Sequence, residues 1–167
     1  MTGPTRCAGC PLAPTRRGFV PGDGPLDARL VVIGEAPGRD EIAAQPPRPF
    51  IGKSGRILRG RLDTNVPTYI TNVRKCLPPD DETPDTHRAS VDHCVASYLQ
   101  PELDLLGNAR VIHAVGADAA GVVAAVGSVL EAQGAVFTRA EVEAMVRAAL
   151  ESNLLALTSG AEYVPES

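Results

Sequence analysis

The four cysteines are the feature of this 167-residue chain that most constrains how it folds. Cys7 and Cys10 form a C-x-x-C pair near the start, whereas Cys76 and Cys94 lie far downstream. A C-x-x-C turn directs two sulfurs toward one point, and two further thiolates complete a tetrahedral sulfur shell that suits zinc or an iron-sulfur cluster. The sequence therefore predicts a metal centre held by all four cysteines.

The spacing of the cysteines distinguishes this centre from a small zinc domain. Sixty-five residues separate Cys10 from Cys76, whereas the second ligand pair of a zinc ribbon or finger follows the first within about 15 to 20 residues. We therefore expect the centre to hold distant parts of one domain together. Two alternatives stay open, a pair of disulfide bonds or four unrelated buried thiols. Residues 1–18 carry no secretion signal, so we expect a non-secreted, cytoplasmic protein whose thiols stay reduced.

Strand and helix patterns alternate along the chain and predict a three-layer α/β/α domain around a mostly parallel, four-stranded sheet. Only 4% of the residues are aromatic, so aliphatic side chains must build the core. Strands are expected at 29–34, 68–73, 109–116 and 154–157. Helices are expected at 55–62 after a cap at Ser54, at 87–106, at 117–126, and at 139–150 after a cap at Thr138. We expect one domain over 1–167, with a cysteine-bearing loop region at 1–29, a polar tail at 158–167 and no membrane span.

Polar side chains follow the first two predicted strands at the edge of the sheet where ligands of open α/β folds bind. Glu35 and Glu41 lie on a Gly- and Pro-rich loop after the first strand, and Asn72 ends the second strand. An asparagine amide both donates and accepts hydrogen bonds, so it can read the edge of a nucleobase. Phe50 lies in a polar loop, where an aromatic ring is available to stack on a base.

Each of these residues also has a structural interpretation. Glu35 is explained equally by an ion pair with a nearby arginine, Asn72 by hydrogen bonds to turn backbone, and Phe50 by packing in the core. The tripeptide Gly52–Ser54 resembles the end of a phosphate-binding P-loop, but Pro47 stands where that motif needs its first glycine. The sequence therefore does not predict a P-loop.

Charge is distributed unevenly along the chain. Residues 1–88 hold 13 Lys and Arg against 10 Asp and Glu, whereas residues 89–167 hold 3 against 10. Between Arg48 and Lys75 there are seven basic residues and one acid, Asp63. Such a segment is typical of a surface that contacts a phosphate backbone, although a solvated helix face explains it equally well.

These segments together resemble the family 4 uracil-DNA glycosylases, which carry an iron-sulfur cluster. The resemblance covers residues 7 to 120 and depends on several motifs in the same order. They are the C-x-x-C pair, "VVIGEAPGRDE", "PFIGKSGRIL", "YITNVRKCLPP", Cys94 before "SYLQPEL", and "ARVIHAVGADAA". The resemblance implies a uracil-DNA glycosylase-like fold and hydrolysis of the N-glycosidic bond of a uracil flipped out of DNA.

The resemblance also implies roles for individual residues. The cluster would be a 4Fe-4S centre with a structural role, with zinc as the alternative, on Cys7, Cys10, Cys76 and Cys94. Phe50 would stack on uracil, Asn72 would bind its polar edge, and Ala36 would contribute backbone contacts. Glu35, Glu41 and Asn72 are the catalytic candidates, with the two glutamates positioning water and shaping the pocket. DNA phosphates would be contacted by Lys53, Ser54, Arg56, Arg74 and Lys75.

One part of the chain departs from the family pattern. Family members carry a His-Pro-Ser motif after their last strand, whereas "NLLAL" is followed here by Thr158, Ser159 and Gly160. No histidine follows His113. We expect a nucleoid-associated monomer acting on uracil-containing DNA, and two alternatives stay open: a second chain that completes the site, or a non-catalytic module of the same fold that binds DNA or a protein partner.

Overall fold

A computed structural model describes residues 5–116 and 119–123 of the chain. Within these ranges the fold is built around three parallel strands in the order β2-β1-β3. The strands are β1 (Leu30–Gly34), β2 (Thr68–Asn72) and β3 (Val111–Ala114). The α/β class and the parallel sheet are confirmed, and the fourth predicted strand at 154–157 lies outside the described residues.

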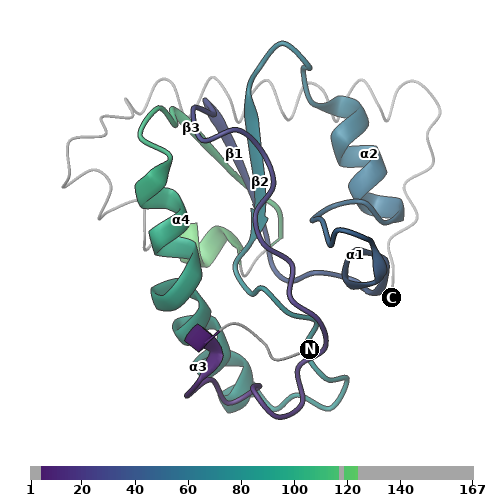
Figure 1. Cartoon of the computed structure of the whole chain (residues 1–167), viewed down its shortest axis with the longest axis vertical. Coiled ribbons are helices and arrows are strands. Elements are labelled where there is room, and N and C mark those ends of the chain that lie inside the picture. Colours follow the sequence, from purple (N-terminus) through teal and green to yellow (C-terminus); the bar gives the residue numbers. More distant parts are fainter. Residues whose placement is uncertain (1–4, 117–118, 124–167) are drawn as a thin grey trace.

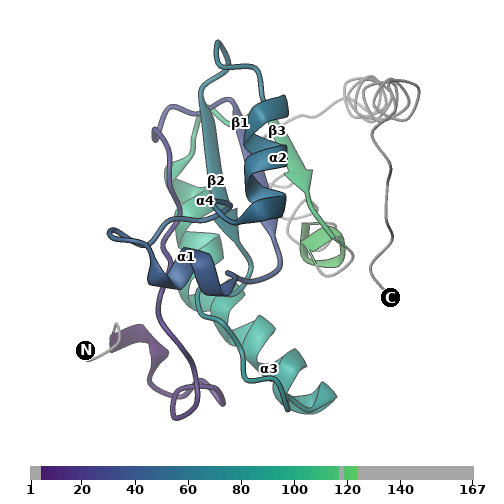
Figure 2. The same cartoon turned by 90° about the vertical axis from the view of Figure 1, so that its right-hand side faces the viewer.

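Helices cover both faces of the sheet, which gives the three layers seen in Figure 1. The short α1 (Arg39–Ala43) and α2 (Lys53–Arg61) lie on one side, and α3 (Pro84–Cys94) and α4 (Gln100–Leu105) lie on the other. Figure 2 views the molecule from the α1 and α2 side. Residues 119–123 are also helical, which agrees with the described part of the helix expected at 117–126. The helix predicted at 139–150 lies outside the described residues.

The core beneath α4 is aliphatic, as the composition predicts. Val31 and Ile33 point from β1 toward Leu99 and Leu103, and all four are buried. Every second residue of a strand faces the same side. Val32 therefore faces the opposite layer, where it is also fully buried. Burial on both faces explains why the β1 sequence is a continuous apolar run rather than an alternating one.

The helix predicted at 87–106 is instead interrupted. The α3 helix begins earlier, at Pro84, because the Thr83 side chain accepts a hydrogen bond from the Thr86 amide and caps it. A single π-helical segment, η2 (Val95–Leu99), then separates α3 from α4. Pro101 has no amide hydrogen with which to bond the carbonyl of Ser97 four residues before it, and Arg6 donates to that carbonyl at 3.1 Å instead.

The predicted cap of α2 is also wrong. The helix begins at Lys53 with Gly52 as its N-cap residue, so Ser54 lies inside the first turn. The amide of Arg56 bonds the Gly52 carbonyl at 2.9 Å, which closes this turn before a Ser54 cap can act. Gly52 caps through its extended backbone alone, and sequence rules weight such caps less than a hydroxyl side chain.

The N-terminal segment crosses the lower part of the sheet and reaches α3 (Figure 1). It includes the 3-10 turn η1 (Thr5–Cys7) and then runs antiparallel to β2 and to the segment after it, with isolated bridges from Asp23 to Ile70 in β2 and from Arg17 to Leu77 beyond it. This path carries the first two cysteines to the other two. Within the described residues, no helix has the length and apolar character needed to cross a membrane.

Candidate functional site

A pocket of about 610 Å³ opens at the carboxyl ends of the strands. Gly34 and Asn72 are the last residues of β1 and β2, and Val115 directly follows β3. The remaining wall comes from the loop after β1, from Phe50, and from the start of α2. The pocket therefore lies where open parallel sheets bind ligands, as the sequence predicts.

Gly34, Phe50 and Asn72 converge at the base of this pocket. Gly34 and Asn72 are register partners in neighbouring strands. A Cβ atom added to Gly34 would overlap both the Phe50 ring and the Asn72 side-chain oxygen. The absence of a side chain at Gly34 is therefore what allows an aromatic ring and an amide to approach one another. The residue-by-residue reading of the sequence did not identify Gly34, although a glycine ending a buried strand is a signal of such close approach.

Asn72 is 2% exposed, and its side-chain nitrogen has no hydrogen-bond partner in the described part of the chain. A buried amide without a partner costs free energy, on the order of 1–3 kcal/mol. Turn backbone does not satisfy this amide, so the structural alternative for Asn72 is not supported. A ligand in the pocket that presents an acceptor to this nitrogen would remove the cost.

Phe50 is half-buried and belongs to the pocket wall rather than to the core. Its backbone has φ of 55°, a left-handed conformation that is uncommon for a bulky residue. Arg59 maintains this loop by donating to the Phe50 carbonyl at 3.0 Å and to the Pro49 carbonyl at 2.8 Å. Gly55 lets α2 lie against the loop, because a Cβ there would overlap the Phe50 backbone.

The structure gives Glu41 a supporting position. The Glu41 carboxylate accepts hydrogen bonds from backbone N-H groups of Gly38, Phe50 and Ile51. Burial raises the pKa of Glu41, although these hydrogen bonds and the charge of Arg59 oppose that shift. Because its oxygens bind backbone on two loops, Glu41 joins the walls of the pocket that it lines, and the catalytic role expected for it stays a prediction.

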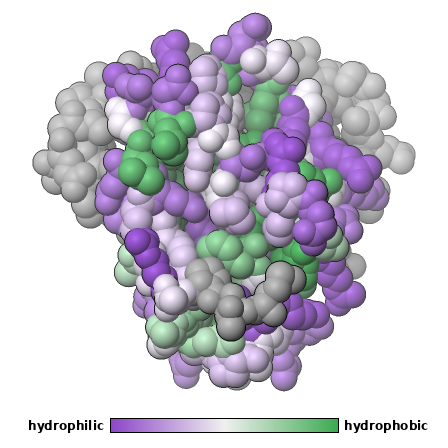
Figure 3. Space-filling view, viewed as in Figure 1, coloured by the Kyte–Doolittle hydropathy of each residue, from purple (hydrophilic) through white to green (hydrophobic). Residues whose placement is uncertain are grey.

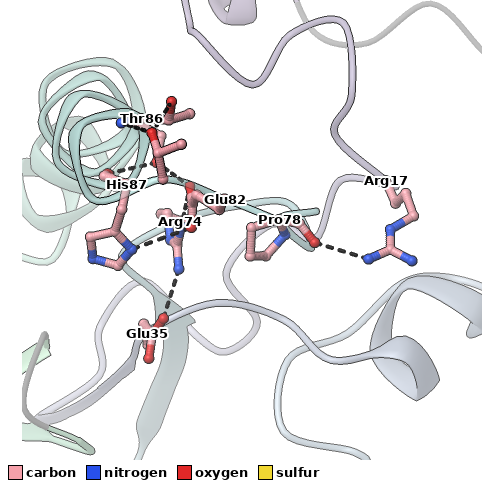
Figure 4. A network of polar contacts seen from close by, with 9 residues as sticks. Arg17, Glu35, Arg74, Pro78, Glu82, Thr86 and His87 are labelled. Atoms are coloured by element: carbon pink, nitrogen blue, oxygen red, sulfur yellow. Dashed lines mark hydrogen bonds and ion pairs between the residues drawn. The ribbon is translucent and has the colours of Figure 1, made fainter. Parts of the chain in front are cut away.

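Glu35 lies at the pocket with its side chain 49% exposed, and it forms the ion pair that the sequence left as an alternative. Arg74 Nη2 donates to Glu35 Oε1 at 2.7 Å. Arg74 Nη1 bonds both carboxylate oxygens of Glu82, at 2.9 and 2.7 Å. Figure 4 shows Arg74 between the two glutamates, with His87 beside Glu82.

Arg74 and Lys75 are buried, with residue exposures of 1% each, so the prediction that they contact DNA phosphates does not fit the structure. Lys75 Nζ bonds Glu102 Oε2 and the carbonyl of Asn72, both at 2.7 Å. Burial lowers the pKa of Lys75, while the charge and hydrogen bond of Glu102 act in the opposite direction. Both cations therefore stabilise the segment between the pocket and Cys76 from inside.

The four cysteines are all buried and all carry free thiols in this structure. Cys7 and Cys94 pack with Tyr98, whose hydroxyl lies 3.2 Å from Cys7 Sγ, and Cys10 packs with Cys76 through Leu12. Burial is the main cause that raises the pKa of Cys76 to about 12, and the neighbouring Cys94, Cys10 and Cys7 contribute to this rise. Burial also raises the pKa of the Cys94 thiol, and positive charge from a metal would favour the thiolate forms of Cys76 and Cys94, so the donor set fits thiolate ligation.

The thiols are not arranged around a single point. Among the described residues, no group of three or more His, Cys, Asp or Glu side chains is placed to hold one metal ion.

Comparison with known proteins is decisive for the family. A sequence model of the uracil DNA glycosylase superfamily matches residues 21–162, most of the chain. The chain belongs to this superfamily. This membership agrees with the parallel sheet and with the pocket at its carboxyl edge.

Several curated members of the superfamily are similar in sequence. A type-4 uracil-DNA glycosylase of Thermotoga maritima is 37% identical over 119 residues, which cover 68% of this chain and 58% of that protein. Those of Pyrobaculum aerophilum and Archaeoglobus fulgidus are 37% and 38% identical over 110 and 104 residues, covering 64% and 60% of this chain and 54% and 50% of theirs. The matches thus span about half the length of these relatives.

The pocket in this uracil DNA glycosylase superfamily member has basic side chains at its mouth beside the acids Glu35, Asp40 and Glu41. Lys53 and Ser54 line the pocket from the exposed first turn of α2, Arg39 lines it from α1, and Arg56 is exposed on the next turn of α2. Ala36 lines the pocket from the loop after β1. The face shown in Figure 3 is mainly hydrophilic, with separate hydrophobic patches between polar regions.

The ion pair of Glu82 predicts how stability depends on pH. Burial alone would raise the pKa of Glu82, but hydrogen bonds and charge from Arg74, assisted by His87, outweigh burial and hold it below the ordinary value of 4.5. A carboxyl group whose pKa is lower in the folded state than in the unfolded state stabilises the folded state. This contribution is fully present at pH values above the unfolded-state pKa, and it is lost as the pH falls through the folded-state pKa.

We expect the unsubstituted protein (the parent) to have a higher melting temperature than the Glu82→Gln variant at about pH 6. The difference between the two melting temperatures should shrink toward about pH 3. Thermal unfolding followed by circular dichroism at a series of pH values, with iron content checked at each, measures this. A difference that stays constant over the whole range would contradict the assigned ion pair.

Proposed function

We propose that this protein hydrolyses the N-glycosidic bond of uracil in DNA, with the base held in the pocket between Phe50 and Asn72. The observation that carries this proposal is the buried side-chain nitrogen of Asn72 at the base of the pocket, which has no hydrogen-bond partner among the residues that the structure describes. The uracil edge presents a carbonyl acceptor and an N-H donor side by side. The Asn72 nitrogen and oxygen match both, whereas cytosine presents an amino donor where uracil has its carbonyl.

The other pocket residues fit the same substrate. The Phe50 ring offers a stacking surface for the base, and its loop is held by Arg59, Gly55 and Glu41 before any ligand binds. Preorganised groups of this kind lower the barrier because they need no rearrangement during the reaction. Glu35 supplies a carboxylate at the pocket that stabilises positive charge developing on the sugar and orients the attacking water.

The exposed basic side chains at the mouth of the pocket support a DNA substrate. Lys53, Ser54 and Arg56 remain our candidates for phosphate contacts, and Arg39 joins them because it is exposed and lines the pocket. Affinity for DNA should therefore fall as salt rises. We propose further that the four cysteines hold a 4Fe-4S cluster, which clamps the N-terminal segment to α3 and to the segment after β2.

The test is release of uracil from an oligonucleotide that contains one deoxyuridine, scored as alkali-labile sites. The parent should cut the uracil strand and leave a thymine strand intact. Asn72→Ala and Glu35→Gln should each lower the single-turnover rate by about 10²-fold or more. Asn65→Ala is the matched control, because Asn65 lies in an exposed turn and bonds Asp63.

A second candidate function rests on the missing histidine, since no histidine follows His113 in the chain. A non-catalytic member would bind DNA in a salt-dependent way without releasing a base. An iron-loaded parent that binds the uracil oligonucleotide but releases no uracil would establish this second function and contradict the first.

A further inference from the structure

Arg74 is the centre of a charge arrangement that extends behind the pocket. Its side chain is 2% exposed, and it receives one carboxylate from each side. Glu82 binds one guanidinium nitrogen through both of its oxygens, whereas Glu35 uses a single oxygen on the other nitrogen. The two glutamates therefore share one buried cation but occupy different environments.

Glu82 is itself fixed. Its side chain is 10% exposed, the Ser90 hydroxyl donates to its Oε1 at 3.3 Å, and His87 Nδ1 lies 3.3 Å from its Oε2. Ser90 and His87 both belong to α3, so the Glu82 carboxylate has a rigid support. Figure 4 shows this chain of contacts from α3 through Glu82 and Arg74 to Glu35.

The two ion pairs of Arg74 differ in geometry and in exposure to solvent. Glu82 brings both carboxylate oxygens to Arg74 Nη1 from a side chain that is 10% exposed, so solvent screens this ion pair less than that of Glu35, whose side chain is 49% exposed. The bond from Arg74 Nη2 holds one oxygen of Glu35, a residue that lines the pocket. Without Glu82, the buried Arg74 charge would have Glu35 as its remaining carboxylate partner among the described residues, and Arg74 would attract Glu35 away from the pocket.

We infer that Glu82 is a positioning residue that acts through Arg74 to orient the Glu35 carboxylate toward the substrate. The catalytic consequence rests on the proposed function, whereas the coupling between the two glutamates does not. Glu82 touches no pocket atom in this arrangement, so its effect must pass through Arg74.

The kinetic test is Glu82→Gln under single-turnover conditions with excess enzyme. A displacement of about 1 Å at a reacting group costs up to about 10²-fold in rate, so the rate at saturation should fall by about 10-fold to 10²-fold. Affinity for the uracil oligonucleotide should be unchanged. Asp81→Asn is the matched control, because Asp81 is an exposed acid in the same loop.

The effect of Glu82→Gln on the single-turnover rate should be measured in two backgrounds, the parent and the Glu35→Gln variant. The comparison separates a positioning role from a general structural effect. If Glu82 acts through Glu35, adding Glu82→Gln to Glu35→Gln should not lower the residual rate further. The inference is overturned if Glu82→Gln lowers the rate of the Glu35→Gln protein by the same factor as it lowers the rate of the unsubstituted protein. It is also overturned if Glu82→Gln alone leaves the rate unchanged. Iron content must match in all variants, because Arg74 precedes Cys76 by two residues.

A thermal unfolding cycle tests the coupling without any activity. Glu35→Gln should lower the melting temperature more in the Glu82→Gln background than in the parent, because Arg74 then loses its second carboxylate. Equal losses in both backgrounds would overturn the inference. A parent that releases no uracil would refute the proposed function alone, and this cycle would still decide the role of Glu82.

Discussion

Replacing Gly34 with alanine is expected to abolish uracil excision while leaving the protein folded. The new methyl group would occupy the space in which the Phe50 ring and the Asn72 side-chain oxygen meet. Both obstacles are side-chain ends, so they can move aside without breaking the backbone of β1 or β2. Their displacement removes the stacking surface and the base-reading amide together, and we expect a loss of at least about 10²-fold in single-turnover rate.

The matched control for this substitution is Gly60→Ala. Gly60 lies near the end of α2, where an added Cβ meets no atom within 4 Å. Alanine favours a helix over glycine by up to about 1 kcal/mol, so this variant should be slightly more stable and fully active. Overpacking at Gly34 should cost about 1–3 kcal/mol of stability. A Gly34→Ala protein that excises uracil at the parental rate would show that the base does not bind at this point.

Replacing Cys76 with serine is expected to cause the largest loss of stability. Cys76 ends the buried segment after β2, and its thiol lies near the other three cysteines. Serine does not replace a thiolate on iron, and free energy of metal binding contributes directly to folding. The melting temperature should fall by about 10 °C or more, since each kcal/mol shifts it by about 2–4 °C in a chain of this size.

Iron, acid-labile sulfide and visible absorption of the purified protein should be measured beside this melting temperature. Ala8→Ser is the control, because it adds a hydroxyl at an exposed position within the C-x-x-C turn. The parent and the control should be brown, and Cys76→Ser should be pale. A colourless parent with one zinc per chain would replace the cluster with the zinc alternative.

The main elements of the fold were predictable because their signals are local. The first strand is a continuous apolar run flanked by polar loops, and the structure places β1 within one residue of it. Helix boundaries were less predictable, because tertiary contacts set them. The π-helical segment before α4 has a local signal in Pro101, but the Ser97 carbonyl that Pro101 leaves free is bonded by Arg6, 91 residues away, and no local pattern encodes that contact.

The site was predictable where residue type alone indicates chemistry, as for Asn72 and Phe50. It was not predictable where the function of a charge depends on burial. Arg74 and Lys75 look like surface cations in the sequence, yet both are buried against acids of later segments. Glu82 lies eight residues after Arg74, and Glu102 lies 27 residues after Lys75. The available signal was the position of Arg74 and Lys75 in a short segment between Asn72, expected at the pocket, and Cys76, expected at the metal centre. Both ends of this segment are buried, so some of the side chains between them are expected to be buried too.

The order of the strands has a consequence for how the protein reaches its native state. The central strand β1 comes first in the chain, and both strands that pair with it come later. Pairings between distant segments close slowly, and uncovered strand edges invite aggregation until they do. We therefore expect sheet closure, rather than helix formation, to limit the rate of refolding, so that Gly34 and Asn72 come together among the last steps.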